Sequence, residues 1–176
     1  MKYPVTNQPS QDTYLLNLTF NTMANTYTQI HIQAIFVVKY RDALINPVWK
    51  DRLHRYIIAT VQNYGHKVLA INSMPDHLHL FFGMRPDQAL SDLLGRTKSS
   101  SSEWLNKEKL TRRHFNWQVG YGAFSYRKKS VDQITRYIAN QEQHHKKKTF
   151  LEEYIELLEE FEIEYDQRYL FVPPIE

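Results

Sequence analysis

The chain of 176 residues contains no cysteine. This absence excludes disulfide bonds, zinc–thiolate sites and thiol catalysis, and it fits a reducing cytoplasm. The sequence also lacks any apolar run that approaches the roughly 20 residues needed to span a bilayer. Residues 1–20 have neither a basic start nor a continuous apolar centre, unlike a secretory signal. We therefore expect a cytoplasmic protein without a membrane partner, long enough for one domain with a single core.

Acidic residues are scarce until the end of the chain. Residues 1–151 carry 21 Lys and Arg against 10 Asp and Glu, whereas residues 152–176 carry one against nine. A basic body with eight histidines favours a polyanionic partner. The acidic segment also has helical apolar spacing, which predicts an amphipathic helix at about 150–163 that covers the core. Its charge could instead repel a polyanion or pair with the basic body of a partner subunit.

Hydrophobic periodicity predicts one domain over residues 25–171, between a polar leader at 1–24 and a short tail at 172–176. Alternating residues predict strands at about 28–38, 68–73, after Pro75, and 117–125. Cap residues predict helix starts after Asn46, Ser130 and Thr149, and a further helix runs from about 87 or 91 to 106. The order is β-α-β-β-α-β followed by two helices. It predicts an α+β, ferredoxin-like split βαβ fold with a four-stranded antiparallel sheet.

The strand after Pro75 contains His77-Leu78-His79. Residues i and i+2 of a strand point the same way, so both imidazoles share a face with Phe81. Two imidazoles on a rigid element form half of a metal site. Taken alone, a His-x-His pair is more often two exposed or hydrogen-bonded histidines.

Tyr137 and Gln141 are one turn apart on the third predicted helix, which starts after Ser130. If this face lies over the histidine strand, the Gln141 oxygen can join His77 and His79 around a divalent ion. Tyr137 would then lie beside the ion, which favours the phenolate and polarises a bound phosphate oxygen. Such a site could attack a phosphodiester and hold the product covalently.

The chain resembles the single-tyrosine HUH transposases of small bacterial insertion sequences and their relatives that act on repetitive extragenic palindromes. The matching pieces lie in order along the chain: Asn25 to His31, Met74 to Leu80, Gly120 to Ser125, and Tyr137 to Lys146. The resemblance implies that His77, His79 and Gln141 bind Mg²⁺ or Mn²⁺ and that Tyr137 is the nucleophile. It further implies homodimers that cut single-stranded DNA near hairpins and leave a 5′-phosphotyrosine. Tyr126 departs from the family pattern, since a small aliphatic residue is expected there, and it is a rival nucleophile.

Basic and hydroxyl side chains supply candidate contacts to DNA phosphates. They are Arg96, Lys98, Ser99, Ser100, Arg112, Arg113, Arg127, Lys128, Lys129, Lys146 and Lys147. Trp104, Trp117 and Tyr121 could stack on unpaired bases, although the two tryptophans are more typical of a packed core.

Two other functions fit the same residues. A domesticated relative would bind hairpin DNA without cutting it, although all four expected site residues are kept. A replication or mobilisation nickase would use the same chemistry but usually carries further domains. The sequence leaves the hairpin, the cleavage site and the choice between a cis and a trans active site open.

Overall fold

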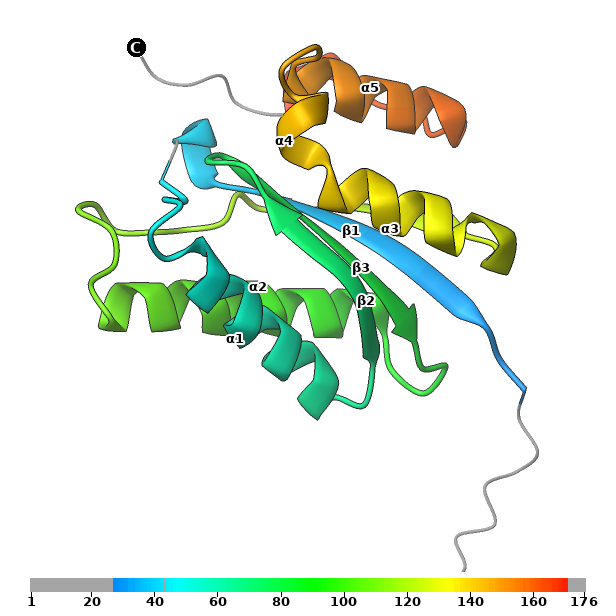
Figure 1. The fold of residues 1–176 in the computed structure, drawn as a ribbon, viewed down its shortest axis with the longest axis horizontal. Coiled ribbons are helices and arrows are strands. Elements are labelled where there is room, and N and C mark those ends of the chain that lie inside the picture. Colours follow the sequence, from blue (N-terminus) through cyan, green and yellow to red (C-terminus); the bar gives the residue numbers. More distant parts are fainter. Residues whose placement is uncertain (1–26, 43, 171–176) are drawn as a thin grey trace, which may run out of the picture.

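The computed structural model describes residues 27–42 and 44–170, so the predicted leader and tail lie outside the described residues. The elements in chain order are β1 (Ile30–Val37), α1 (Lys50–Asn63), β2 (Lys67–Ser73), β3 (His77–Met84), α2 (Leu90–Lys107), β4 (Gly122–Tyr126), α3 (Val131–Ala139), α4 (Gln141–His144), α5 (Phe150–Glu160) and α6 (Gln167–Leu170). The strands form one antiparallel sheet in the order β2-β3-β1-β4 (Figure 1). The predicted α+β fold class is confirmed.

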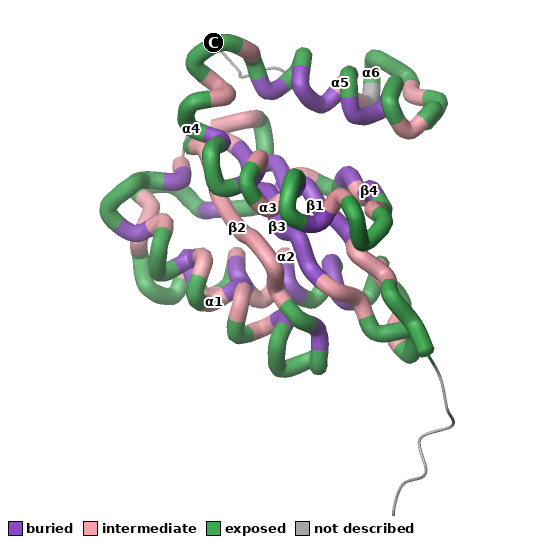
Figure 2. The backbone as a smooth tube through the Cα atoms, turned by 45° about the vertical axis from the view of Figure 1, so that its right-hand side comes forward, coloured by how far each residue is buried: buried purple, intermediate pink, exposed green. Residues whose placement is uncertain are grey.

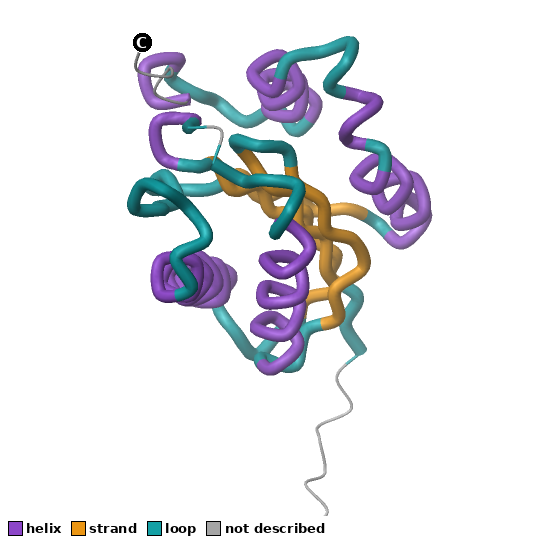
Figure 3. Tube along the Cα trace, turned by 60° about the vertical axis from the view of Figure 1, so that its left-hand side comes forward, coloured by secondary structure: helices purple, strands orange, loops and turns teal. Residues whose placement is uncertain are grey.

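Helices cover both faces of the sheet. Residues of β1 alternate between the faces, so Ala34 and Phe36 pack toward α1 and α2 whereas Ile35 and Val37 pack toward α5. Figures 1 and 3 show the strands between two groups of helices, with α3, α4 and α5 on the side away from α1 and α2. The C-terminal helices therefore cover the face that the split βαβ pattern leaves open.

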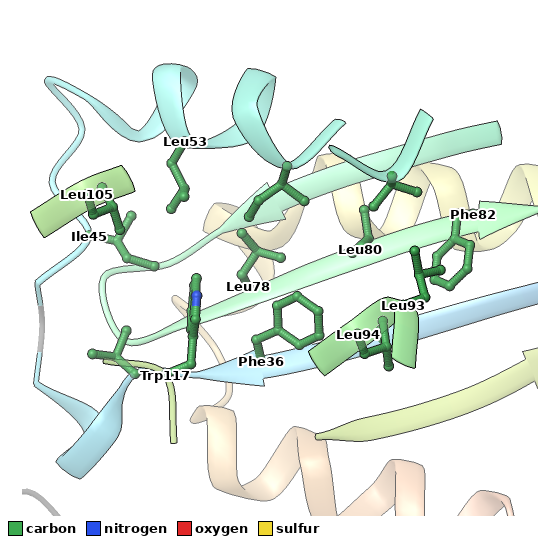
Figure 4. Close-up of a cluster of buried hydrophobic side chains, with 14 of the residues drawn as sticks. Phe36, Ile45, Leu53, Leu78, Leu80, Phe82, Leu93, Leu94, Leu105 and Trp117 are labelled. Carbon is green, nitrogen blue, oxygen red and sulfur yellow. The ribbon is translucent and has the colours of Figure 1, made fainter. Parts of the chain in front are cut away.

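The larger core lies between the sheet and the pair α1 and α2 (Figure 4). It is filled by side chains from the sheet, both helices and the segment after α2, among them Phe36, Leu53, Leu78, Leu80, Phe82, Leu93, Leu94, Leu105 and Trp117. Burying each such side chain stabilises the fold by about 1.5 to 3 kcal/mol. Because the apolar residues of β3 alternate with His77 and His79, this core sends both imidazoles to the opposite face.

The structure confirms one of the three predicted helix caps and changes the other two. The first helix begins three residues later than expected, at Lys50, because the backbone of Trp49 is not helical, with φ −126° and ψ 0°. Asn46 still accepts a 2.9 Å hydrogen bond from the Val48 amide in the turn before the helix. Ser130 precedes α3 but makes no side-chain capping bond with the described residues, since a 3-10 turn runs straight into that helix. The Thr149 capping box of α5 is confirmed.

The fourth strand is shorter than predicted. It begins at Gly122, because Trp117 makes only an isolated bridge to Val38. In the part of the chain that the structure describes, no helix is both long and apolar enough to cross a membrane.

Candidate active site

The central strand β3 holds His77 and His79 beneath the C-terminal helices. Their exposed fractions are 1% and 0%, and their ring centroids lie 5.2 Å apart. Figure 2 shows this part of β3 as buried. The ring of Phe150, the first residue of α5, stacks on His77 at 4.0 Å between centroids. The pair therefore faces α3, α4 and α5 and is shielded from water.

The second pair of predicted residues reaches the same place from successive helices. The ring of Tyr137 on α3 lies 6.3 Å from the ring of His79, and Gln141 is fully buried at the start of α4. The prediction that one helix carries both residues was wrong, because the chain leaves helical geometry at Asn140. Asn72 of β2 donates to the carbonyls of Ile138 and Ala139 at 2.9 and 3.2 Å, which ties this break to the sheet.

Two further residues complete the cluster. The hydroxyl of Tyr137 donates a hydrogen bond to Oε1 of Glu153, and Nε2 of Gln141 donates to the same oxygen at 3.2 Å. Nε2 of His145 lies 3.0 Å from the other carboxylate oxygen, and Nε2 of His79 lies 3.6 Å from Oε1. Glu153 therefore touches every predicted site residue except His77.

Glu153 is not among the residues that the sequence predicted for the site. The acidic segment was expected to form a helix that covers the core, whereas the buried face of α5 includes Glu153 beside Phe150 and Tyr154. The sequence did hold one signal. Glu153 comes three residues after Phe150 and directly before Tyr154, so its carboxylate shares the apolar face of the helix with these two aromatic residues. A buried carboxylate needs a compensating partner, which makes such a position a candidate for a site.

Glu153 is ionised in spite of its burial. Burial raises the pKa of a carboxyl group, but the hydrogen bond with His145, the nearby His79 and the Tyr137 hydroxyl outweigh this and hold the pKa of Glu153 at about 2. Burial and the Glu153 charge together raise the pKa of Tyr137. Burial lowers the pKa of His79 to about 3. At pH 7 the Tyr137 hydroxyl is therefore neutral, and a cation beside it would favour the phenolate.

Tyr126, the rival tyrosine, lies near Tyr137 but packs differently. Its ring makes edge contacts with Phe81 and Phe161, at 6.0 and 5.2 Å between centroids. Both tyrosines line a hollow of about 210 Å³ that Glu153 and Glu160 also line. Tyr137 alone of the two donates to the buried carboxylate, so the geometry favours it as the reacting group.

Most of the predicted phosphate contacts are exposed. The exposed ones are Arg96, Ser99, Arg112, Arg113, Arg127, Lys128, Lys129, Lys146 and Lys147. Lys98 and Ser100 are half-buried, and Lys98 donates to the carbonyls of Gln118 and Gly120. Burial lowers the pKa of Lys98 to about 8. Lys98 thus holds the loop before β4, and its contact with DNA stays a prediction.

The predicted stacking residues are divided between core and surface. Trp117 is buried and donates through Nε1 to Ser101 at 2.9 Å, and Trp104 stacks on Tyr56. Tyr121 is 39% exposed and lines a groove of about 660 Å³ between α2 and the loop before β4. Of the three aromatic residues, Tyr121 is therefore the best placed to meet an unpaired base.

Comparison with known proteins identifies a family and a fold. The model of a family described as IS200-like transposases matches residues 26–141. The ISDra2 transposase TnpA of Deinococcus radiodurans is 28% identical over 119 residues, which cover 64% of this chain and 84% of that protein.

Two solved structures share the fold. A protein of Deinococcus radiodurans R1 that is assigned as a transposase has a TM-score of 0.56 at 21% identity, over 67% of this chain and 95% of that one. A REP-associated tyrosine transposase bound to a REP hairpin has a TM-score of 0.54 at 15% identity, over 69% and 72%. His145 and Glu153 follow the last residue of the family match.

Proposed function

The chain belongs to the family of IS200-like transposases, and from this premise we propose that it cuts and rejoins single-stranded DNA beside hairpins through a phosphotyrosine intermediate on Tyr137. The observation that carries the proposal is the meeting of Tyr137, His79 and Gln141 in one buried cluster of a single chain. Tyrosine, imidazole and amide groups in contact supply a nucleophile and donors for a cation.

The buried donors fit a divalent cation. Nε2 of His79 and Oε1 of Gln141 have no hydrogen-bond partner among the described residues, although both side chains are fully buried. Buried polar atoms left unpaired are costly, and a cation at this position would satisfy them. His77, His79 and Gln141 would thus hold Mg²⁺ or Mn²⁺. When bound, such an ion would polarise the phosphate whose bond is cut.

The protein's own residues would carry the transfer as follows. The Tyr137 oxygen attacks the phosphorus, and the bond from phosphorus to the 3′ oxygen of the preceding nucleotide breaks. The hydroxyl proton of Tyr137 leaves to solvent by way of Glu153, which accepts its hydrogen bond but has too low a pKa to keep the proton. The departing 3′ oxygen takes up a proton from solvent and becomes a free hydroxyl. Attack of a 3′-hydroxyl on the phosphotyrosine reverses the same steps and rejoins DNA.

The exposed basic residues would hold the strand by its phosphates. Arg127, Lys128 and Lys129 precede the helix that carries Tyr137, and Lys146 and Lys147 follow α4, so these charges flank the cluster in sequence. A hairpin ligand is supported by the solved relative that holds a REP hairpin. A DNA substrate places the proposed reaction in the cytoplasm.

The homodimer implied by the resemblance stays a prediction. Tyr137 meets His79 of its own chain, so the four predicted site residues gather without a second subunit. Light scattering of the full chain, alone and with hairpin DNA, would determine the oligomeric state. A cis active site predicts that mixing Tyr137→Phe and His79→Ala chains restores no cleavage.

A labelled hairpin strand with single-stranded flanks tests the proposal. The 5′ phosphate stays on tyrosine, so a 3′-end label should become protein-bound in denaturing gels while a 5′-end label is released on a shorter strand. We expect Tyr137→Phe to abolish the adduct and Tyr126→Phe to retain it. Wild-type protein that binds hairpins but yields no adduct with Mg²⁺ or Mn²⁺ would indicate a binding protein instead.

A further inference from the structure

The ligand atoms of three imidazoles and one carboxylate lie close together in the cluster. Nε2 of His77 lies 3.1 Å from Nε2 of His145, which lies 3.0 Å from Oε2 of Glu153. Nε2 of His79 lies 3.6 Å from the other oxygen of Glu153. One donor atom from each of the four residues lies within 4.8 Å of all the others. Donors bound to one ion at about 2.1 Å have neighbour separations of about 3.0 to 3.5 Å, so the cluster has the size of a metal centre.

The other ring nitrogen of each histidine has a partner outside the cluster. Nδ1 of His77 lies 2.7 Å from the carboxylate of Asp76, and Nδ1 of His145 lies 3.1 Å from the carbonyl of Lys148. Both acceptors place a proton on Nδ1 and leave the Nε2 lone pair directed at the cluster.

The third histidine has an amide partner. Nδ1 of His79 lies 3.1 Å from the side-chain amide of Gln33, whose Oε1 is buried without a partner among the described residues. Rotating this amide by 180° lets Oε1 accept from Nδ1–H, which satisfies the oxygen and gives His79 the same tautomer. Metal-binding histidines are held in this way by outer hydrogen bonds.

Hydrogen bonds from Tyr137 and Gln141 satisfy Oε1 of Glu153 but do not explain the rest of the arrangement. If Nδ1 carries the proton in His77 and in His145, two Nε2 lone pairs face each other at 3.1 Å beside an anionic carboxylate. Such a group of acceptors repels itself unless a cation lies among them. A proton shared by His145 and Glu153 would relieve part of the repulsion but would leave Nε2 of His79 unpaired.

We infer that His145 and Glu153 extend the metal site of this transposase to three imidazoles and a carboxylate, which bind a first-row transition-metal dication in preference to Mg²⁺. Mg²⁺ prefers oxygen donors in octahedral geometry, whereas imidazole nitrogens suit ions such as Fe²⁺, Ni²⁺ and Zn²⁺, and the affinity of a nitrogen and oxygen site rises from Mn²⁺ to Co²⁺. Both added donors lie beyond residues 26–141, the part that matches the family. Gln141 then also positions Glu153 through its 3.2 Å hydrogen bond. The inference deepens the proposed function by assigning its metal, but metal binding can be measured without DNA.

The test is metal binding by the full chain after treatment with a chelator. Titration calorimetry with Mn²⁺, Co²⁺, Zn²⁺ and Mg²⁺, and the visible absorption of Co²⁺, measure affinity and nitrogen ligation directly. We expect Glu153→Gln and His145→Gln each to weaken Mn²⁺ and Co²⁺ binding by at least about tenfold. The matched controls Glu159→Gln, exposed on the same helix, and His114→Gln, an exposed histidine, should keep the wild-type affinity.

The outcomes separate the inference from the proposed function. Wild-type affinity in both Glu153→Gln and His145→Gln, or equal affinity of the wild type for Mg²⁺ and Co²⁺, would overturn the inference even if the Tyr137 adduct forms. Tight Mn²⁺ binding without any adduct would instead contradict the proposed function and leave the inference about the metal site standing. Circular dichroism of each variant checks that it is folded. If Glu153→Gln fails this check, His145→Gln and the wild-type metal preference decide.

Discussion

The Nδ1 atom of His77 lies 2.7 Å from Oδ1 of Asp76, its neighbour in the chain. The other oxygen of Asp76 accepts two hydrogen bonds from Arg41, at 3.0 and 3.2 Å. Arg41 thus fixes the carboxylate, and the carboxylate fixes the tautomer of the imidazole. This chain of contacts links the segment after β1 to the candidate metal site.

Replacing Asp76 by Ala should therefore weaken metal binding without removing a ligand. Loss of an outer hydrogen bond to a metal-binding histidine typically costs about 10- to 100-fold in affinity. Calorimetry with Mn²⁺ checks this, with Asp87→Ala as control because Asp87 pairs with Arg85 at the surface. Unchanged affinity in a folded Asp76→Ala protein would contradict a role in orienting His77.

Two glycines should respond to alanine in opposite directions. A Cβ atom on Gly122 would lie 2.7 Å from the ring of Tyr154 on α5 and 3.2 Å from Phe124. Gly122→Ala should therefore loosen the packing of α5 on β4 and destabilise the protein by about 1 to 3 kcal/mol. Gly95 on α2 has open space around its Cα, and Gly95→Ala should stabilise that helix by up to about 1 kcal/mol. Thermal denaturation of both variants checks the signs, and an unchanged Tm for Gly122→Ala would mean that α5 does not pack there.

His54 should make stability depend on pH. Burial, followed by the positive charge of Lys50, lowers the pKa of His54 from 6.5 to about 4. In the unfolded chain the His54 imidazole takes up its proton near pH 6.5, whereas in the folded protein it does so only near pH 4. Between these two pH values the unfolded chain therefore binds more protons than the folded protein. This contribution of His54 to the free energy of unfolding is fully present above this window and is lost as the pH falls through it, by about 3 kcal/mol in total.

Urea denaturation at pH 7 and pH 4.5 measures this loss. The variant His54→Gln should show a shallower dependence on pH than the wild type, because the titrating group is gone. The exposed His114 provides the control variant His114→Gln. Parallel pH dependence of the wild type and His54→Gln would show that another group is responsible.

The basic turn before α3 should contribute to DNA affinity through charge alone. Replacing Lys128 and Lys129 by Ala should weaken binding of hairpin and unrelated strands alike, and it should reduce the dependence of log K on log salt by about 1 for each lost phosphate contact. Fluorescence anisotropy at several salt concentrations measures both effects. Lys67→Ala, an exposed lysine on β2, is the control. If the variant has the same salt dependence as the wild type, these two lysines do not contact DNA phosphates.

Patterns between near neighbours predicted much of the fold. The alternation along β1 and β3 gave the correct faces, since the side chains of a strand alternate whatever surrounds them. The capping box of α5 was likewise visible in four residues. The early start assigned to α1 failed because Trp49 is not helical. The single helix assigned to Tyr137 and Gln141 failed at Asn140, where Asn72 binds carbonyls that a continuous helix would use.

The sequence by itself determined the order of the strands and of the first two helices, the shared face of His77 and His79, and the family to which the chain belongs. Only the tertiary structure decided what completes the site. His77 and His145 are 68 residues apart in the chain, and Glu153 lies on a helix that the sequence analysis assigned to covering the core. No periodicity relates residues so far apart, because their meeting depends on which face of the sheet each helix packs against and on how each helix is rotated.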